Sequence, residues 1–285
     1  MAEQERPAGT WAQRWRAARV IGERQRSGLN SSIGIYVTMS LALAAASLTL
    51  HNTVQFVERN AVLSARQPLF LPVTLIVVAF SFILGIGAAL STARERDRGT
   101  LRVLLFGPAD EVAFLFGHFQ AHVATYAMMA AFGVVWANLV TYLLNLDFSW
   151  HVIAAFALSI LTVAAVIAFG LLAGVWGGTT RSTLVYLILI TVALIGLQIG
   201  VDVIPGLARE MSPTQNDPIF VVRDVLVALN AVAQWVSPYA QLSQALEAML
   251  DGNAGRIALH IGVTITQTLI FFSAAALVLK RKEGR

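Results

Sequence analysis

Six long apolar stretches divide the chain, and short polar segments separate them. They lie at 32–50, 69–92, 115–145, 152–177, 184–204 and 258–279. A helix that crosses a membrane needs about 20 mainly apolar residues, whereas a membrane strand is shorter and alternates in polarity. The pattern therefore predicts an all-α membrane protein with a bundle of six transmembrane helices. No polar stretch is long enough for a separate soluble domain.

Composition agrees with this prediction. Hydrophobic residues make up 57% of the 285 residues and charged residues only 13%, whereas soluble domains carry about 25% charged residues. The net charge of +4 comes from basic residues beside the apolar stretches, so it indicates topology and no nucleic-acid partner. Cysteine is absent, which excludes disulfides and cysteine catalysis.

The basic residues predict the orientation of the bundle. Fifteen of the 20 lysines and arginines fall on one side of the six-helix topology. These are Arg6, Arg14, Arg16, Arg19, Arg24, Arg26, Arg94, Arg96, Arg98, Arg102, Arg181, Lys280, Arg281, Lys282 and Arg285. Positive residues favour the cytoplasmic side, so we expect both termini there.

The chain divides into an N-terminal arm at 1–31, a transmembrane domain at 32–279 and a cytoplasmic tail at 280–285. In the arm, two tryptophans and two small residues are spaced so that they would lie on one side of a helix, with arginines beside them. These residues are Trp11, Trp15, Ala18 and Gly22. The spacing favours an interfacial helix on the lipid bilayer, with tryptophans at headgroup depth. The alternative is a disordered basic arm.

Residues 206–252 are expected on the outer side as re-entrant helices. The stretch 219–236 is apolar enough for a seventh span, but a seventh span would place the basic tail outside. Polar residues also interrupt it, namely Arg223, Asp224, Asn230 and Gln234. A second short helix should follow, with Ser237 as N-cap, Pro238 as its first residue and Gly252 just past its end.

The segment 93–116, between the second and third apolar stretches, carries alternating charges and then leucines. Its central residues are Arg94, Glu95, Arg96, Asp97, Arg98, Gly99, Thr100, Leu101, Arg102, Val103, Leu104, Leu105, Phe106, Gly107 and Pro108. A short helix of this kind on the cytoplasmic face can dock into a partner's groove. On physical grounds alone, a charged anchor with no partner explains the pattern equally well.

This block resembles the signature of the ABC-2 type transporter permeases. The resemblance implies six helices, a cytoplasmic coupling helix between the second and third, and re-entrant helices before the last. The Ser237-Pro238-Tyr239 segment is similar to that of the gliding-motility and copper-enzyme-maturation branch. The implied coupling residues are Glu95, Arg96, Arg98, Gly99, Thr100, Leu101, Leu104, Leu105 and Pro108.

The resemblance also implies partners: an ABC ATPase subunit and a second permease chain, identical or homologous. We expect no enzymatic activity, no catalytic residue and no cofactor in this chain, because it lacks GxxxxGK[ST]. ATP and magnesium would then bind to the ATPase. The implied location is the plasma membrane of a prokaryote, and the implied activity is export.

Other polar and small residues fit simpler roles. His118 and His122 have a spacing that can hold a metal, but no third ligand is evident nearby, so we expect interfacial histidines and no metal. Three glycines spaced four apart indicate close helix packing, within the bundle or across a dimer. They are Gly170, Gly174 and Gly178.

Two rival functions remain at this point. One is secondary transport, which usually needs acidic or basic residues inside the membrane. Polar residues deep in the expected spans are few: Asn138, Thr141 and Gln198, with Asp202 near an outer end. The other rival is a membrane assembly factor that transports nothing.

Overall fold

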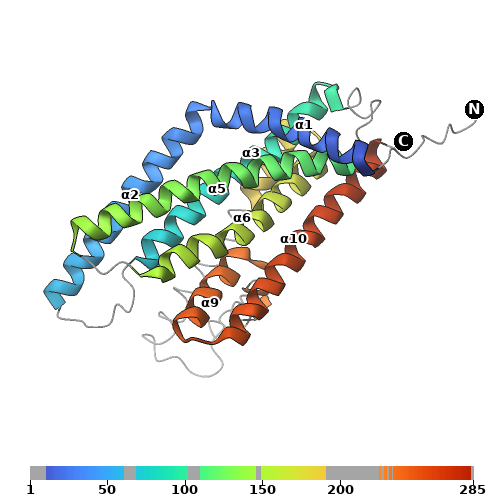
Figure 1. Ribbon diagram of the computed structural model, residues 1–285. Helices are drawn as coiled ribbons and strands as arrows, with labels where there is room; N and C mark the ends of the chain where they lie inside the picture. The colour runs from blue at the N-terminus through green and yellow to red at the C-terminus, as the bar shows by residue number, and fades with distance from the viewer. Residues whose placement is uncertain are drawn as a thin grey trace, which may run out of the picture.

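The computed structural model describes residues 11–60, 69–101, 110–145, 149–190, 225, 228–229, 231–232 and 234–283. Every regular element in these ranges is a helix (Figure 1). The labelled helices are α1 (Trp11–Asn30), α2 (Ile33–Asn60), α3 (Phe70–Asp97), α5 (Glu111–Leu143), α6 (Trp150–Gly177), α9 (Pro238–Leu250) and α10 (Ala254–Glu283). The chain is thus an all-α membrane protein, as the apolar stretches predict.

Five described helices are long and apolar enough to cross a membrane: α2, α3, α5, α6 and α10. The expected span 184–204 is described only as far as residue 190, where it forms the apolar helix Thr180–Ile190. The rest of that span lies outside the described residues. So does most of the expected re-entrant stretch 219–236. Residues 280–283, expected in the tail, continue α10.

Helix α6 is the centre of the bundle. It packs against α3, α5, α9 and α10, and 56% of its most apolar stretch is buried, against 17% for α10. Outer helices instead expose large apolar side chains, including Leu41 and Leu48 on α2 and Leu269 and Leu277 on α10. Such surfaces are rare on soluble monomers and suit contact with lipid.

The glycines of α6 allow α3 to approach closely. A Cβ on Gly170 would overlap the carbonyl oxygen of Gly85, and one on Gly174 would overlap that of Ala89. Two of the three predicted glycines therefore lie at an interface within the bundle. Gly178 differs from the expectation: it is the C-cap of α6, with φ of +74°. Its role is to end the helix, because L-residues with a side chain disfavour this conformation.

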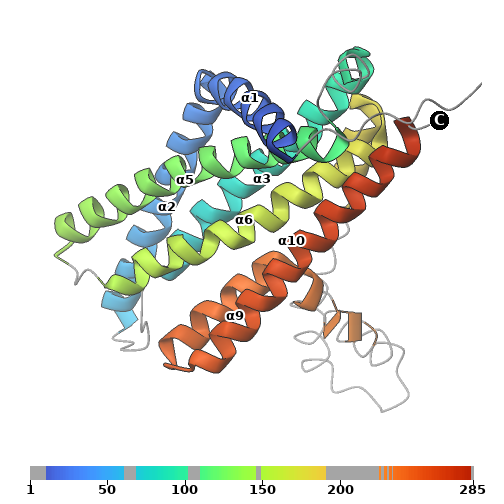
Figure 2. The same ribbon diagram turned by 45° about the vertical axis from the view of Figure 1, so that its right-hand side comes forward.

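The short helix α9 begins and ends where the sequence predicts. The Ser237 hydroxyl accepts a hydrogen bond from the amide of Ala240, Pro238 is in the first turn, and Gly252 follows the helix with φ of +67°. With 13 residues, α9 is too short to cross a bilayer, since each residue adds about 1.5 Å. It lies beside the first half of α10, at the end of the bundle away from α1 (Figure 2).

The arm forms helix α1, as its tryptophan pattern predicts. It packs across the start of α5, where Ala18 and Gly22 are buried. A Cβ on Gly117 of α5 would lie 2.7 Å from the carbonyl oxygen of Ala18. Small residues on both helices therefore let the two backbones touch.

Candidate coupling site at the basic end of the bundle

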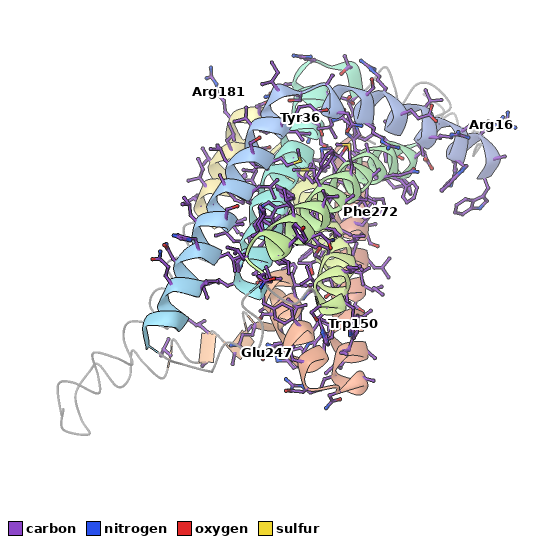
Figure 3. The ribbon with its side chains drawn as sticks, turned by 60° about the vertical axis from the view of Figure 1, so that its left-hand side comes forward. Arg16, Tyr36, Trp150, Arg181, Glu247 and Phe272 are labelled. Atoms are coloured by element: carbon purple, nitrogen blue, oxygen red, sulfur yellow. The ribbon has the colours of Figure 1, made fainter. Side chains whose placement is uncertain are left out.

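Most described basic residues gather at one end of the bundle. Arg16 and Arg181 lie at this end, whereas Trp150 and Glu247 lie at the other (Figure 3). We call it the basic end; it holds α1 and the C-terminal ends of α3, α6 and α10. Among the described residues, its lysines and arginines are Arg14, Arg16, Arg19, Arg24, Arg26, Arg94, Arg96, Arg98, Arg181, Lys280, Arg281 and Lys282.

The predicted coupling segment starts at this end with a sharp turn. Helix α3 ends at Asp97, and Gly99 has φ of +70°. A residue with a Cβ disfavours that backbone conformation, which explains the glycine. Helical structure resumes at Thr100, whose hydroxyl donates to the carbonyl of Glu95 at 2.9 Å. Leu101 is buried.

Residues 102–109 lie outside the described part of the chain. Three residues predicted to form the coupling surface belong to them, namely Leu104, Leu105 and Pro108. The structure therefore describes the two ends of the segment, and its anchors can be identified there.

One anchor joins the end of α3 to the end of α6. The Arg96 guanidinium donates to the carbonyl of Val175 at 3.1 Å. The carboxylate of Asp97 accepts from the amide of Thr180 at 2.8 Å and from its hydroxyl at 2.7 Å. Asp97 thus serves as an N-terminal cap for the helix Thr180–Ile190, supplied by another helix. These bonds fix the start of the coupling segment to the turn after α6.

The end of α10 binds the same turn. The Lys282 ammonium donates to the carbonyl of Val175 at 3.1 Å and to that of Trp176 at 2.6 Å. Helix C-termini carry unpaired carbonyls and partial negative charge, so cations stabilise them. Arg96 and Lys282 therefore hold three helix ends together at one point.

A second anchor joins α3 to α5 on either side of the coupling segment. Nε2 of His118 lies 3.7 Å from Oε2 of Glu95, and Nδ1 of the same imidazole lies 3.3 Å from the Ser91 hydroxyl. The His118 side chain is only 1% exposed. The imidazole therefore lies between Glu95 and Ser91 of α3, and its contact with the Ser91 hydroxyl ties the ends of α3 and α5.

The two histidines expected at the membrane interface lie inside the bundle, and their depth in the membrane stays a prediction. His118 and His122 are both buried, because this face of α5 packs on α3, where Gly87 leaves room for the His122 ring. Among the described residues, no group of three potential ligands could hold a metal ion.

A third anchor holds the other end of the coupling segment. Asp110 is the N-cap of α5, where its carboxylate accepts from the amide of Ala113 at 2.8 Å. The same carboxylate pairs with Arg14 of α1 at 3.2 Å. The segment that begins after Asp97 and ends at Asp110 is therefore fixed at its start to the turn after α6 and at its end to α1 and α5. Motion of this segment would reach most of the bundle.

The side chain of Arg98, one of the predicted coupling residues, takes no part in the anchors described above. Arg98 is the C-cap of α3, and its exposed side chain pairs with no residue that the structure describes. Arg14, Asp110 and Lys282 also belong to this site, although no sequence pattern near them indicates it, because each contact joins segments far apart in the chain. The alternating charges near Asp97 were the one local pattern that indicated a contact site here.

Polar residues inside the bundle are more numerous than the sequence indicated. Ser81 of α3 binds the Tyr239 hydroxyl of α9 at 2.7 Å, and Nδ1 of His260 lies 2.7 Å from the Gln241 amide oxygen. Asn138 and Thr141 only bond carbonyls of their own helix. Gln198 and Asp202 lie outside the described residues. The Ser81–Tyr239 and His260–Gln241 contacts therefore hold α9 against α3 and α10.

Comparison with known proteins identifies the family to which the chain belongs. No curated protein matches the chain in sequence. The sequence profile of the family described as ABC-2 family transporter protein matches residues 20–283, which includes every labelled helix except the first half of α1. A match over nearly the whole chain, together with its membrane-spanning helices, shows a multi-pass membrane permease that belongs to the ABC-2 transporter family.

Proposed function

We propose that this chain is the membrane subunit of an ATP-driven exporter whose ATPase is a separate chain. The observation that carries the proposal is the coupling segment, fixed at both ends to the bundle by Arg96, Asp97 and Asp110. A partner that pushes on this segment would move α1, α3, α5, α6 and α10 together. The chain itself carries no GxxxxGK[ST] phosphate loop, so ATP and magnesium would bind to the partner.

Two permease chains and two ATPase chains would form the working complex in a prokaryotic plasma membrane. Closure of the ATPases on ATP would change access through the bundle or squeeze the substrate outward. The described spans are mainly apolar, which favours an amphipathic or lipid-like substrate. A secondary transporter or an assembly factor would need no such fixed cytoplasmic segment.

The basic end would face the cytoplasm, since positive residues favour that side. A cysteine placed at Gly28 should then react with a membrane-impermeant maleimide only from the cytoplasm, and one at Glu247 only from outside. The chain has no cysteine of its own, and a Cβ at Gly28 meets nothing within 4 Å. Labelling of both positions from the same side would contradict this orientation.

The partner is tested by co-purification. The tagged chain, extracted from native membranes in mild detergent, should carry a protein with a phosphate loop, and the reconstituted pair should hydrolyse ATP. Addition of the permease should raise the rate of ATP hydrolysis by the isolated ATPase. A chain that is intact and monodisperse but binds no such ATPase would contradict the proposal and favour the rival functions.

A further inference from the structure

A groove of about 420 Å³ runs between α1 and α5 at the basic end. Its floor consists of small residues, namely Gly22 on α1, where the two helices touch, and Ala121 and Ala124 on α5. Its other lining residues are Trp15, Arg19, Glu23, Arg26 and Gln120. The groove is separate from the coupling contacts, although Arg14 of the same α1 helix binds Asp110.

The α1 wall of the groove is cationic with an aromatic end. Trp15, Arg19, Gly22 and Arg26 follow one another at intervals of four, three and four, which places them on one stripe of the helix. Arg19 pairs with Glu23 at 2.9 Å. Arg26 is exposed and pairs with no described residue. The stripe therefore offers at least one guanidinium whose planar donors suit a phosphate.

The position of helix α1 and its exposed side chains indicate the source of a phosphate that could bind there. Helix α1 lies across the end of a membrane bundle and carries five arginines against one glutamate. It nevertheless exposes Trp11, Trp15 and Val20, at 84%, 56% and 66%. Exposed tryptophans among arginines are typical of a helix at headgroup depth. At that depth, the phosphates at hand are those of lipids.

We propose that this groove binds one anionic phospholipid, with its phosphate on Arg26, since Glu23 already pairs with Arg19, and with its apolar part along the groove toward Trp15, about 16 Å away along the helix. The lipid would join α1 to α5 and would steady the Arg14–Asp110 contact beside the coupling segment. The site requires the membrane but no ATPase, so it can be tested independently of the proposed function.

The test is native mass spectrometry of the purified chain titrated with phosphatidylglycerol or with phosphatidylcholine of the same acyl chains. One phosphatidylglycerol should bind about fivefold tighter than phosphatidylcholine, the expected gain from one unpaired basic residue near an anionic headgroup. The double variant Arg19→Gln and Arg26→Gln should lose this preference. Equal binding of both lipids by the native chain would overturn the proposal.

A matched control is Arg16→Gln with Arg24→Gln, which removes the same charge from the same helix outside the groove; Arg16 points away from the bundle (Figure 3). This control should keep the preference to within about 1.5-fold. If it loses the preference as fully as the groove variant, general charge attraction explains the binding and the site is excluded.

A second variant keeps the charges. Ala124→Leu fills the groove and should weaken phosphatidylglycerol binding about tenfold, even if the arginine variant fails to fold. Retained binding would overturn the proposal. Displacement of the lipid by inorganic phosphate would identify a free-anion site instead, and loss of ATPase co-purification with unchanged lipid binding would identify a protein surface.

Discussion

Replacing Gly170 and Gly174 with alanine should destabilise the bundle strongly. Each new Cβ would overlap a backbone carbonyl of α3, at Gly85 or Ala89. Backbone atoms cannot move aside as a flexible side chain can, so the two helices must separate. Overpacking of this kind costs about 1–3 kcal/mol at each position. We expect a lower thermal unfolding midpoint in detergent, measured by tryptophan fluorescence, or a loss of monodisperse protein.

The matched control is Gly262→Ala on α10, where an added Cβ meets nothing within 4 Å. It should leave the midpoint unchanged or raise it slightly, since alanine favours helices more than glycine does. If the α6 double variant unfolds at the same temperature as this control, α3 and α6 do not pack as closely as described.

Replacing Leu104 and Leu105 with aspartate should abolish binding of the ATPase. The coupling segment has its ends outside the apolar spans, at Asp97 and Asp110, so these leucines are expected outside the hydrocarbon. The bundle should therefore still insert and fold. Two carboxylates in an apolar docking groove would remain desolvated and unpaired, which is expensive. Affinity should fall at least about 100-fold, as for loss of an interface hot spot.

The measurement is a pull-down of the ATPase with native and substituted permease, with monodispersity as the folding control. The matched variant carries aspartate at Leu143 and Leu144, two exposed leucines at the other end of α5. It should retain the ATPase. Full retention and full ATPase stimulation by the Leu104 and Leu105 variant would contradict the coupling assignment and leave the helix bundle unaffected.

Local sequence signals predicted local structure well. Helix α9 begins after Ser237, at Pro238, and ends before Gly252, as expected. Such residues start or stop a helix through backbone atoms a few residues away. Gly99, which the resemblance placed in the coupling segment, forms the turn after α3. The positions of α2, α3, α5, α6 and α10 follow from the apolar stretches, since lipid requires helices to satisfy their own backbone groups. Their lengths do not follow in every case, because α2 continues to Asn60 and α10 runs from Ala254 to Glu283, beyond the apolar residues.

The tertiary contacts of the site could not be predicted in this way. Arg96 and Lys282 bind the same carbonyl although 186 residues separate them in sequence, and no pattern near either residue specifies that partner. The two histidines of α5 show the same limit. Their spacing placed them on one face of the helix, but only the packing of α3 determines that this face is buried.

The most direct test of the coupling segment is site-specific photo-crosslinking in membranes that contain the intact complex. A benzophenone amino acid replaces Leu104 in one sample and Leu143, at the other end of α5, in a second. The account predicts an ATPase adduct from position 104 and none from position 143. An intact complex that gives no adduct at 104, or an adduct at 143 instead, would contradict it.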